Sequence, residues 1–279
     1  MRRRVATPVD DYGATIQAIA ALIEDIEAEI GQRGSLGFGI PGTVSPATGR
    51  IKNAPNSPFN GYRLDADLQA RLGRPVRLMN DANCFALSEA RDGAAAGAAL
   101  VFGAILGTGC GGGIVFNGAL LTGRNAVSGE WGHTPLPWMR PREQPGPSCA
   151  CGLAGCIETF VSGTGFSARH AATTGARLDA AEIARRAAAG DDACAESLAR
   201  YEDQLARALA GIINVIDPDI IVLGGGMSNV QRLYVNVPML WCKWVFFDRV
   251  DTRLSPPLHG DSSGVRGAAW LWPETEEAA

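Results

Sequence analysis

The chain has 279 residues, a formal net charge of −4 and 46% hydrophobic residues, values that are typical of a globular protein with a sizeable core. The acidic balance argues against a nucleic-acid partner, because phosphate backbones select clustered Lys and Arg and the basic run Arg2–Arg4 is too short to count. No segment approaches the roughly 20 consecutive apolar residues of a membrane span and the first residues lack the apolar core of a signal peptide, so we expect a cytoplasmic protein with no membrane partner.

The first hundred residues alternate helical and strand patterns. Isoleucines at three- and four-residue steps indicate an amphipathic helix at the start. Pro41 and Gly42 stop the first apolar run, and Gly73 closes the second helix. In chain order the sequence predicts a helix over 10–30, a buried strand entering a loop over 35–42, a short helix over 63–73, a strand over 75–79, and a loop turning into an Ala-rich helix over 80–97.

The remainder begins with two apolar strands around a glycine turn over 99–123, with an Asn-Gly turn at Asn117 and Gly118. A helical region is expected over 179–215, because Asp179 and Glu182 resemble a capping box. The buried stripe of this region is predicted to be Leu198, Tyr201, Leu205, Leu209 and Ile212. A strand over 217–226 that ends in three glycines and a helix over 262–272 complete the prediction.

Strands that alternate with helices and end in Gly or Asp predict an α/β fold, in which ligands gather at the carboxyl ends of the strands. Residues 92–99, a stretch of small residues, are the best candidate for a boundary between two lobes. We therefore expect an N-terminal lobe over 1–95 and a C-terminal lobe over 96–279.

Three of the seven cysteines fall within eight residues, downstream of one of only three histidines. His133, Cys149, Cys151 and Cys156 offer three thiolates and an imidazole, which is a closed ligand set for structural zinc. The alternative is three reduced cysteines in a loop, since an odd total argues against a disulfide framework. An ion would order a segment rich in Pro and Gly that has few apolar residues to bury.

Two glycine turns and one acidic loop follow strands. The turns are Gly107–Gly113 and Gly224–Gly226, and glycines there let backbone N–H groups approach phosphate oxygens, although the first turn could simply be a tight hairpin. Asp81 follows a strand directly, where a carboxylate can accept a hydroxyl proton or simply cap the next helix. Glu130 and Glu158 lie close to the predicted zinc ligands in sequence, so a metal would fix them too, whereas His170 and His259 are expected to be surface or structural residues.

The segments "NDANC", "GTGCGGG", "GEWGH", "CACGLAGCIE" and "DPDIIVLGGG" together resemble the ROK family of bacterial sugar kinases and sugar-responsive repressors, over essentially the whole chain. "GHTPLPW" and "HGDSSGVRGAAWLWP" look most like the branch of fructokinases that also accept mannose. The resemblance implies an actin-like, hexokinase-like α/β fold with two lobes around a cleft. It also implies a homodimer that transfers the γ-phosphoryl group of ATP, with Mg²⁺, to a hexose hydroxyl, usually O6.

Site residues are carried over from this resemblance by position. Asp81 would bind the sugar and act as general base, and Asn80, Glu130, His133 and Glu158 would hydrogen-bond the sugar hydroxyls. His133 would also bind zinc, with Cys149, Cys151 and Cys156. ATP phosphates would contact Gly107, Thr108, Gly109, Cys110, Gly111, Gly112 and Gly113, and the adenosine would lie near Gly224, Gly225 and Gly226.

The chain departs from the family pattern at its start. The family begins with an apolar strand and a "GxDxGGTK"-like turn, and this sequence has neither; "MRRRVATP" looks like the tail of the family's early β-meander. We therefore expect an incomplete N-terminal lobe, and two explanations compete: the start codon was called too late and the cellular protein is longer, or this shorter chain is real. In the second case we expect kinase activity to be reduced by orders of magnitude, because phosphate positioning supplies much of the barrier reduction. Alternatives to a fructokinase are a non-catalytic sugar-binding protein and a glucose or N-acetylhexosamine kinase of the same family.

Overall fold

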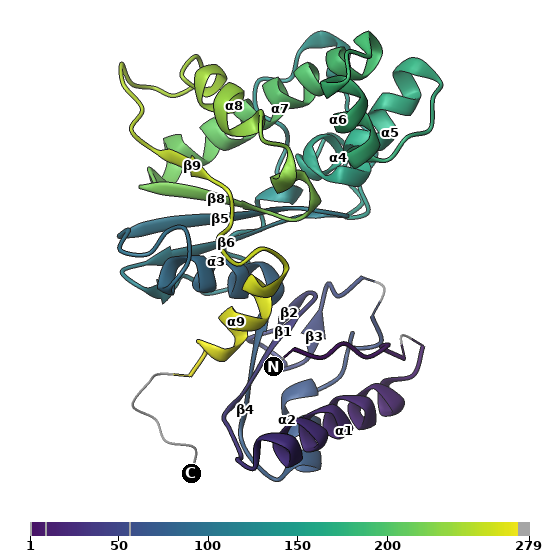
Figure 1. Ribbon diagram of the computed structural model, residues 1–279, viewed down its shortest axis with the longest axis vertical. Helices are drawn as coiled ribbons and strands as arrows, with labels where there is room; N and C mark the ends of the chain where they lie inside the picture. The colour runs from purple at the N-terminus through teal and green to yellow at the C-terminus, as the bar shows by residue number, and fades with distance from the viewer. Residues whose placement is uncertain (1, 9, 56, 273–279) are drawn as a thin grey trace.

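Two α/β units follow one another along the long axis of the computed structural model, which describes residues 2–8, 10–55 and 57–272 (Figure 1). The first unit contains α1 (Tyr12–Ile30), β1 (Leu36–Ile40), β2 (Thr43–Val44), β3 (Ile51–Lys52), α2 (Leu64–Leu72) and β4 (Val76–Asn80). β1 pairs with β4 in parallel and β2 pairs with β3 in antiparallel. Residues 2–8, where the tail of a β-meander was expected, lie in neither a strand nor a helix.

A five-stranded sheet organises the second unit. Its strands are β5 (Leu100–Leu106), β6 (Cys110–Phe116), β7 (Ala119–Leu120), β8 (Ile220–Gly224) and β9 (Arg253–Ser255), in the spatial order β7-β6-β5-β8-β9. The helices are α3 (Asp81–Arg91), α4 (Glu158–Val161), α5 (Gly163–Thr174), α6 (Ala180–Ala188), α7 (Asp192–Ile216), α8 (Leu233–Trp241) and α9 (Ser263–Ala269). Among the described residues, none of these helices combines the length and apolar character that crossing a membrane requires.

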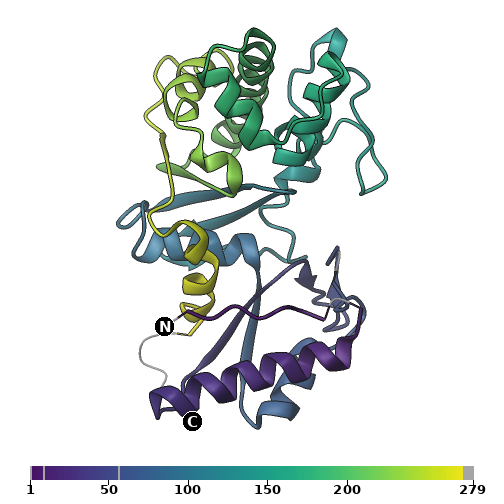
Figure 2. The ribbon, with the colours of Figure 1, turned by 45° about the vertical axis from the view of Figure 1, so that its right-hand side comes forward.

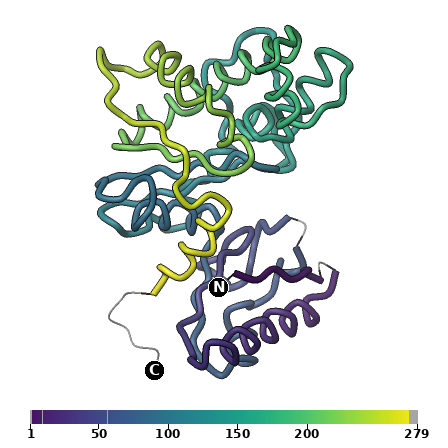
Figure 3. The backbone as a smooth tube through the Cα atoms, viewed as in Figure 1, coloured from purple at the N-terminus to yellow at the C-terminus, as the bar shows by residue number. Residues whose placement is uncertain are grey.

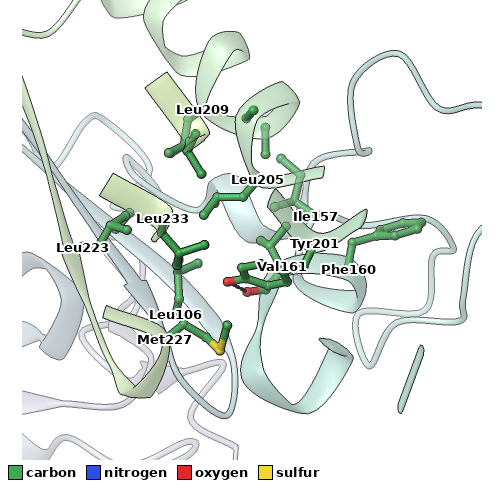
Figure 4. Close-up of a cluster of buried hydrophobic side chains, with 14 of the residues drawn as sticks. Leu106, Ile157, Phe160, Val161, Tyr201, Leu205, Leu209, Leu223, Met227 and Leu233 are labelled. Carbon is green, nitrogen blue, oxygen red and sulfur yellow. Dashed lines mark hydrogen bonds between the residues drawn. The ribbon is translucent and has the colours of Figure 1, made fainter. Parts of the chain in front are cut away.

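Alternate residues of the central strands face two different helical layers. On β5, Phe102 and Leu106 belong to a core with α4–α8, whereas Val101 packs with Phe85 of α3 on the opposite face. Figure 4 shows Leu106 and Leu223 pointing toward Leu205 and other side chains of the first core. The sheet is therefore buried on both faces, which explains why its strands are apolar runs rather than alternating patterns.

The predicted stripe of α7 is confirmed for Leu198, Tyr201, Leu205 and Leu209, which are each at most 1% exposed, whereas Ile212 is only partly buried. The predicted loop before the Ala-rich helix is wrong: the helix begins at Asp81 directly after β4 and ends at Arg91. The prediction missed α5, whose Gly163 and Gly165 weaken the helical signal, and the Ser162 side chain caps its first turn.

The chain passes from the first unit into the second between β4 and α3, and after β9 it returns toward the first unit through α9, as the tube in Figure 3 shows. α9 lies between α3 and the first unit, and Figure 2 confirms this from a second direction. α3 precedes the predicted boundary at residue 95 but packs on the sheet of the second unit. The boundary itself stays a prediction.

Buried polar contacts join α3 to the segment that leads into α9. Glu89 is fully buried and accepts hydrogen bonds from the backbone N–H groups of Ala94 and Leu258 and from the Ser263 hydroxyl. Asp92 pairs with His259 and with Arg266 of α9. His259 thus has a structural role, which is one of the two roles that the sequence predicted for it.

Gly267→Ala is expected to destabilise the protein by about 2–3 kcal/mol, because overpacking a closed contact forces backbone shifts. A Cβ at Gly267 would collide with the Cys84 carbonyl oxygen where α9 crosses α3. Gly264, in the same helix, has no neighbour within 4 Å of such a Cβ, so Gly264→Ala is the matched control and should be neutral or slightly stabilising. Urea denaturation of both variants measures the difference, and equal midpoints would contradict the close helix crossing.

Candidate active site

The strand-to-helix junction of β4 and α3 presents the predicted catalytic carboxylate. Asn80, not Asp81, caps α3: its Oδ1 accepts from Ala82 N at 3.0 Å and its Nδ2 donates to the Gly42 carbonyl at 3.0 Å. This leaves one amide hydrogen of Asn80 for a ligand. Asp81 is the first residue of the helix and its side chain is exposed. Because a neighbour does the capping, the Asp81 carboxylate can serve a reaction.

The protein around Asp81 disfavours its charged form. Burial among neighbouring groups is the main cause that raises the pKa of Asp81, although its side chain keeps contact with solvent. The hydrogen bond from Ala82 N to Oδ1, at 2.8 Å, lowers the pKa and only partly opposes this effect. A carboxylate with a raised pKa is a better proton acceptor when it is ionised.

The two predicted glycine turns lie side by side, because β5 and β8 are parallel neighbours whose last paired residues are Ile105 and Gly224. Gly225 has a φ of 76°, and a Cβ there would lie 2.6 Å from the Leu106 carbonyl carbon. A Cβ at Gly107 or at Gly226 would meet nothing within 4 Å, so both residues expose backbone to open space. This edge of the sheet can therefore admit a phosphate chain close to the backbone.

Three of the predicted phosphate-binding glycines are used in packing. Gly111, Gly112 and Gly113 lie within β6, not in the turn that precedes it. A Cβ at Gly113 would lie 2.8 Å from the carbonyl oxygen of Ala82, and one at Gly112 would lie 2.8 Å from the Trp131 ring. These glycines let α3 and Trp131 approach the sheet, so we retain Gly107–Gly109 as the candidate phosphate contacts.

Glu158 connects the β5–β6 turn to the segment that carries Cys149, Cys151 and Cys156. Its Oε2 accepts from Cys110 N at 2.9 Å, although the two residues are far apart in the sequence. Burial raises the pKa of Glu130, His133 lowers it, and the Asp81 and Glu158 carboxylates raise it further. Such mutual effects require proximity. The structure thus brings Asp81, Glu130, His133 and Glu158 into one electrostatic neighbourhood.

The predicted zinc ligands converge. The ligand atoms of His133, Cys149, Cys151 and Cys156 all lie within 4.8 Å of one another. Cys149 Sγ lies 3.5 Å from His133 Nδ1, and Cys151 Sγ lies 3.6 Å from Cys156 Sγ. A tetrahedral zinc ion with bonds of about 2.3 Å to sulfur and 2.0–2.1 Å to nitrogen requires separations of about 3.8 Å between thiolates and 3.6 Å from thiolate to nitrogen. The donor set therefore fits zinc, and Nε2 on the far side of the His133 ring is the atom that would face a ligand.

A buried ion pair, which sequence reasoning missed, holds the zinc segment against α7. We use this name for residues 133–156, which carry the four predicted zinc ligands. Arg207 is fully buried and donates to Glu143 Oε1 at 2.7 Å and to the carbonyls of Pro137 and Trp138. Glu143 also accepts from Gln204 at 2.9 Å. An arginine in a helix and a glutamate in a Pro-rich loop look like ordinary surface residues in sequence, so no local pattern signals their contact.

Cys151→Ser is expected to remove the bound metal, because a serine hydroxyl is a poor zinc ligand and three donors remain. Elemental analysis of purified protein should give about one zinc per chain for the wild type and well below half of that for the variant. Cys242→Ser is the matched control, since Cys242 is also exposed and lies outside the ligand set. Zinc-free wild-type protein, or a variant that keeps its zinc, would contradict the assignment.

A hollow elsewhere on the surface does not compete with this site. It has a volume of about 1050 Å³ and is lined by residues that include Asn214, Asp219, Phe246 and Arg253. None of the predicted site residues lines it. The arrangement at Asp81 combines a proton acceptor, further polar side chains and glycine turns, which are the parts that phosphoryl transfer to an alcohol requires.

Comparison with known proteins supports the same chemistry. The sequence pattern of the ROK family matches residues 1–275. The chain is 41% identical over 272 residues to an N-acetyl-D-glucosamine kinase of Photobacterium profundum, covering 96% of this chain and 90% of that protein. It is 42% identical over 274 residues to an N-acetyl-D-glucosamine kinase of Shigella boydii serotype 4, with the same coverage.

Solved structures agree with the fold. A ROK hexokinase from Thermus thermophilus superimposes with a TM-score of 0.84 at 31% identity, covering 95% of this chain and 87% of that one. A ROK family glucokinase from Streptomyces griseus, in complex with glucose and AMPPNP, gives a TM-score of 0.79 at 28% identity, covering 96% and 89%. The predicted actin-like, hexokinase-like fold is thus confirmed, and the chain belongs to the ROK family, as one of its sugar kinases.

Proposed function

We propose that the protein transfers the γ-phosphoryl group of ATP to N-acetyl-D-glucosamine. The support for the reaction type is the position of Asp81, a carboxylate at a strand-to-helix junction that is exposed and has a raised pKa. The support for the substrate is the identity of 41–42% to relatives that bear the name N-acetyl-D-glucosamine kinase. These relatives do not support the preference for fructose that the sequence suggested.

In the proposed mechanism Asp81 accepts the proton of the attacking sugar hydroxyl, O6 by analogy with the family. The hydroxyl oxygen then forms a bond to the γ-phosphorus as the bond to the β-phosphate oxygen breaks, which gives ADP and the sugar 6-phosphate. Mg²⁺, when bound with ATP, neutralises charge on the phosphates. The N–H groups of Thr108 and Gly109 would hold phosphate oxygens, since Gly107 N already donates to the Gly109 carbonyl, and Gly224–Gly226 would lie beside the adenosine.

The zinc segment would orient the sugar. Glu130, Glu158 and His133 Nε2 are the proposed hydrogen-bonding groups, and the ion would fix them through His133 and through Cys156, which lies two residues before Glu158. The zinc site is closed and offers no open position for water, so its role is structural. Rigid positioning matters here because phosphoryl transfer depends on alignment more than on covalent help.

An ADP-release assay with N-acetyl-D-glucosamine, glucose, mannose and fructose tests the proposal. We expect kcat/KM for N-acetyl-D-glucosamine to exceed that for each other sugar by about 10-fold or more, since one substituent commonly changes transition-state binding by that factor. A higher value for fructose would contradict the substrate assignment. Sugar binding by calorimetry without turnover on any of the four would contradict the kinase assignment and favour a non-catalytic sugar-binding protein.

A further inference from the structure

A small polar cavity lies between α5 and α7, apart from every residue assigned to the candidate active site. Its volume is about 20 Å³, and its lining includes Arg169, His170, Ser197, Arg200 and Gln204. A cavity of this size can hold one water molecule or one small ion, and it is too small for a phosphate or a nucleotide. The lining side chains decide whether a water molecule or a small ion occupies it.

A chain of hydrogen bonds ends at this cavity with an unused donor. Arg200 Nη2 donates to Ser197 Oγ at 2.9 Å, and Ser197 Oγ lies 2.9 Å from His170 Nδ1. Within the described part of the chain the Ser197 hydroxyl contacts no other acceptor, so we assign its hydrogen to Nδ1. A neutral imidazole that accepts at Nδ1 carries its hydrogen at Nε2, and a protonated ring carries one there as well.

His170 Nε2 is therefore a buried donor that lacks an acceptor. The residue is only 2% exposed, and Nε2 has no hydrogen-bond partner among the described protein atoms. Buried polar atoms are paired in the great majority of native structures, so each exception points to a missing partner. The partner must accept a hydrogen bond, which oxygen atoms and anions do and cations do not.

The charges around the cavity favour an anion over a neutral acceptor. Arg169 stacks over the Phe160 ring at 4.6 Å and forms no ion pair with an acid among residues 2–8, 10–55 and 57–272. Burial and the neighbouring cations Arg200, Arg142 and Arg207 lower the pKa of Arg169, and Glu143 alone opposes them. The negative charge of Glu143 is already balanced by its ion pair with Arg207 at 2.7 Å, so it does not neutralise Arg169.

We propose that this cavity binds one monovalent anion of halide size, such as chloride, between the Arg169 guanidinium and His170 Nε2. The anion would connect α5 to α7 and complete the hydrogen-bond chain that begins at Arg200. Through Arg169 and Phe160 it would also brace α4, which begins at Glu158. It would therefore stabilise the helices that support the sugar-facing side of the molecule.

Thermal unfolding in potassium chloride against potassium gluconate, at constant ionic strength, tests the proposal on the full chain. We expect chloride to raise the Tm of the wild type by about 2–4 °C in a saturable way, because a ligand that binds only the folded state stabilises it. Arg169→Gln should lose this rise. Arg177→Gln, which removes an exposed arginine from the loop after α5, should keep it and is the matched control.

A crystal of the wild type grown with bromide gives a second readout that needs no variant. An anomalous peak between Arg169 and His170 would support the site. Electron density without an anomalous signal there would mean that the cavity holds a water molecule and would overturn the proposal. So would the absence of a saturable rise in the wild type, or an equal rise in Arg169→Gln.

Discussion

Asp81→Asn is expected to lower kcat by about 10²–10⁴-fold, the range that a positioned general base contributes. The asparagine has the same shape and can keep the hydrogen bond from Ala82 N, but its amide cannot accept the hydroxyl proton at the transition state. Sugar binding should change little, because an asparagine can still hydrogen-bond the sugar hydroxyl and because Glu130, His133 and Glu158 are proposed to hold the rest of the ring. The loss should therefore appear in kcat and not in the dissociation constant of the sugar.

Stability measurements separate this catalytic role from a structural one. An acid whose folded-state pKa is raised favours the protonated form in the fold, so its charge works against folding near neutral pH. Removing that charge should leave Tm unchanged or raise it. Asp65→Asn is the matched control, since Asp65 is also an acid in the first turn of a helix and should not affect kcat. A near-normal kcat for Asp81→Asn, or a lower Tm, would contradict the assignment.

The pH profile provides an independent check. Asp81 must be ionised to accept a proton, so the rate falls as the pH decreases through its pKa. Because that pKa is raised above the ordinary value of 3.8, the acidic limb of kcat/KM should lie at a higher pH than an unperturbed aspartate would give. Asp81→Asn should lack this limb, and an identical limb in the variant would assign it to another group.

Arg207→Met is expected to destabilise the protein by about 3–5 kcal/mol, the usual effect of removing one partner of a buried ion pair. The variant leaves Glu143, only 6% exposed, without its main cation, and it frees the carbonyls of Pro137 and Trp138. Although burial raises it, the pKa of Glu143 is lowered overall by Arg207 and by hydrogen bonds from Gln204 and Arg140 N. The stabilisation from this carboxylate is therefore present at neutral pH and lost as the pH falls through its lowered pKa.

Urea denaturation near pH 7 measures this effect. The double variant Glu143→Gln/Arg207→Met should recover part of the loss, because it no longer buries an uncompensated charge. Arg185→Met is the control: its ion pair with Glu182 is 68% exposed on the arginine side, so its removal should cost less than about 1 kcal/mol. Equal midpoints for Arg207→Met and Arg185→Met would contradict the role of the buried pair in holding the zinc segment.

Several features of this protein were readable from sequence because each depends on residues that are close in the chain. Helix ends at Gly73 and at Asp179 follow from local backbone and capping preferences, and the strands β5, β6 and β8 follow from apolar runs bounded by glycine. Three of the four predicted metal ligands lie within one short segment, and their residue types leave few other chemistries. Local spacing therefore determined many of the elements, the candidate donor set and the position of Asp81 directly after a strand.

Tertiary structure decided what those elements do together. The pairing of β5 with β8 puts two glycine turns on one edge, and the fold brings Glu158 to Cys110 N and Arg207 to Glu143. It also assigned Gly111–Gly113 to packing and His170 to a buried position. These contacts join residues tens of positions apart, and burial and pKa depend on everything that surrounds a group. No spacing along the chain encodes such environments, so they exist only once the chain has folded.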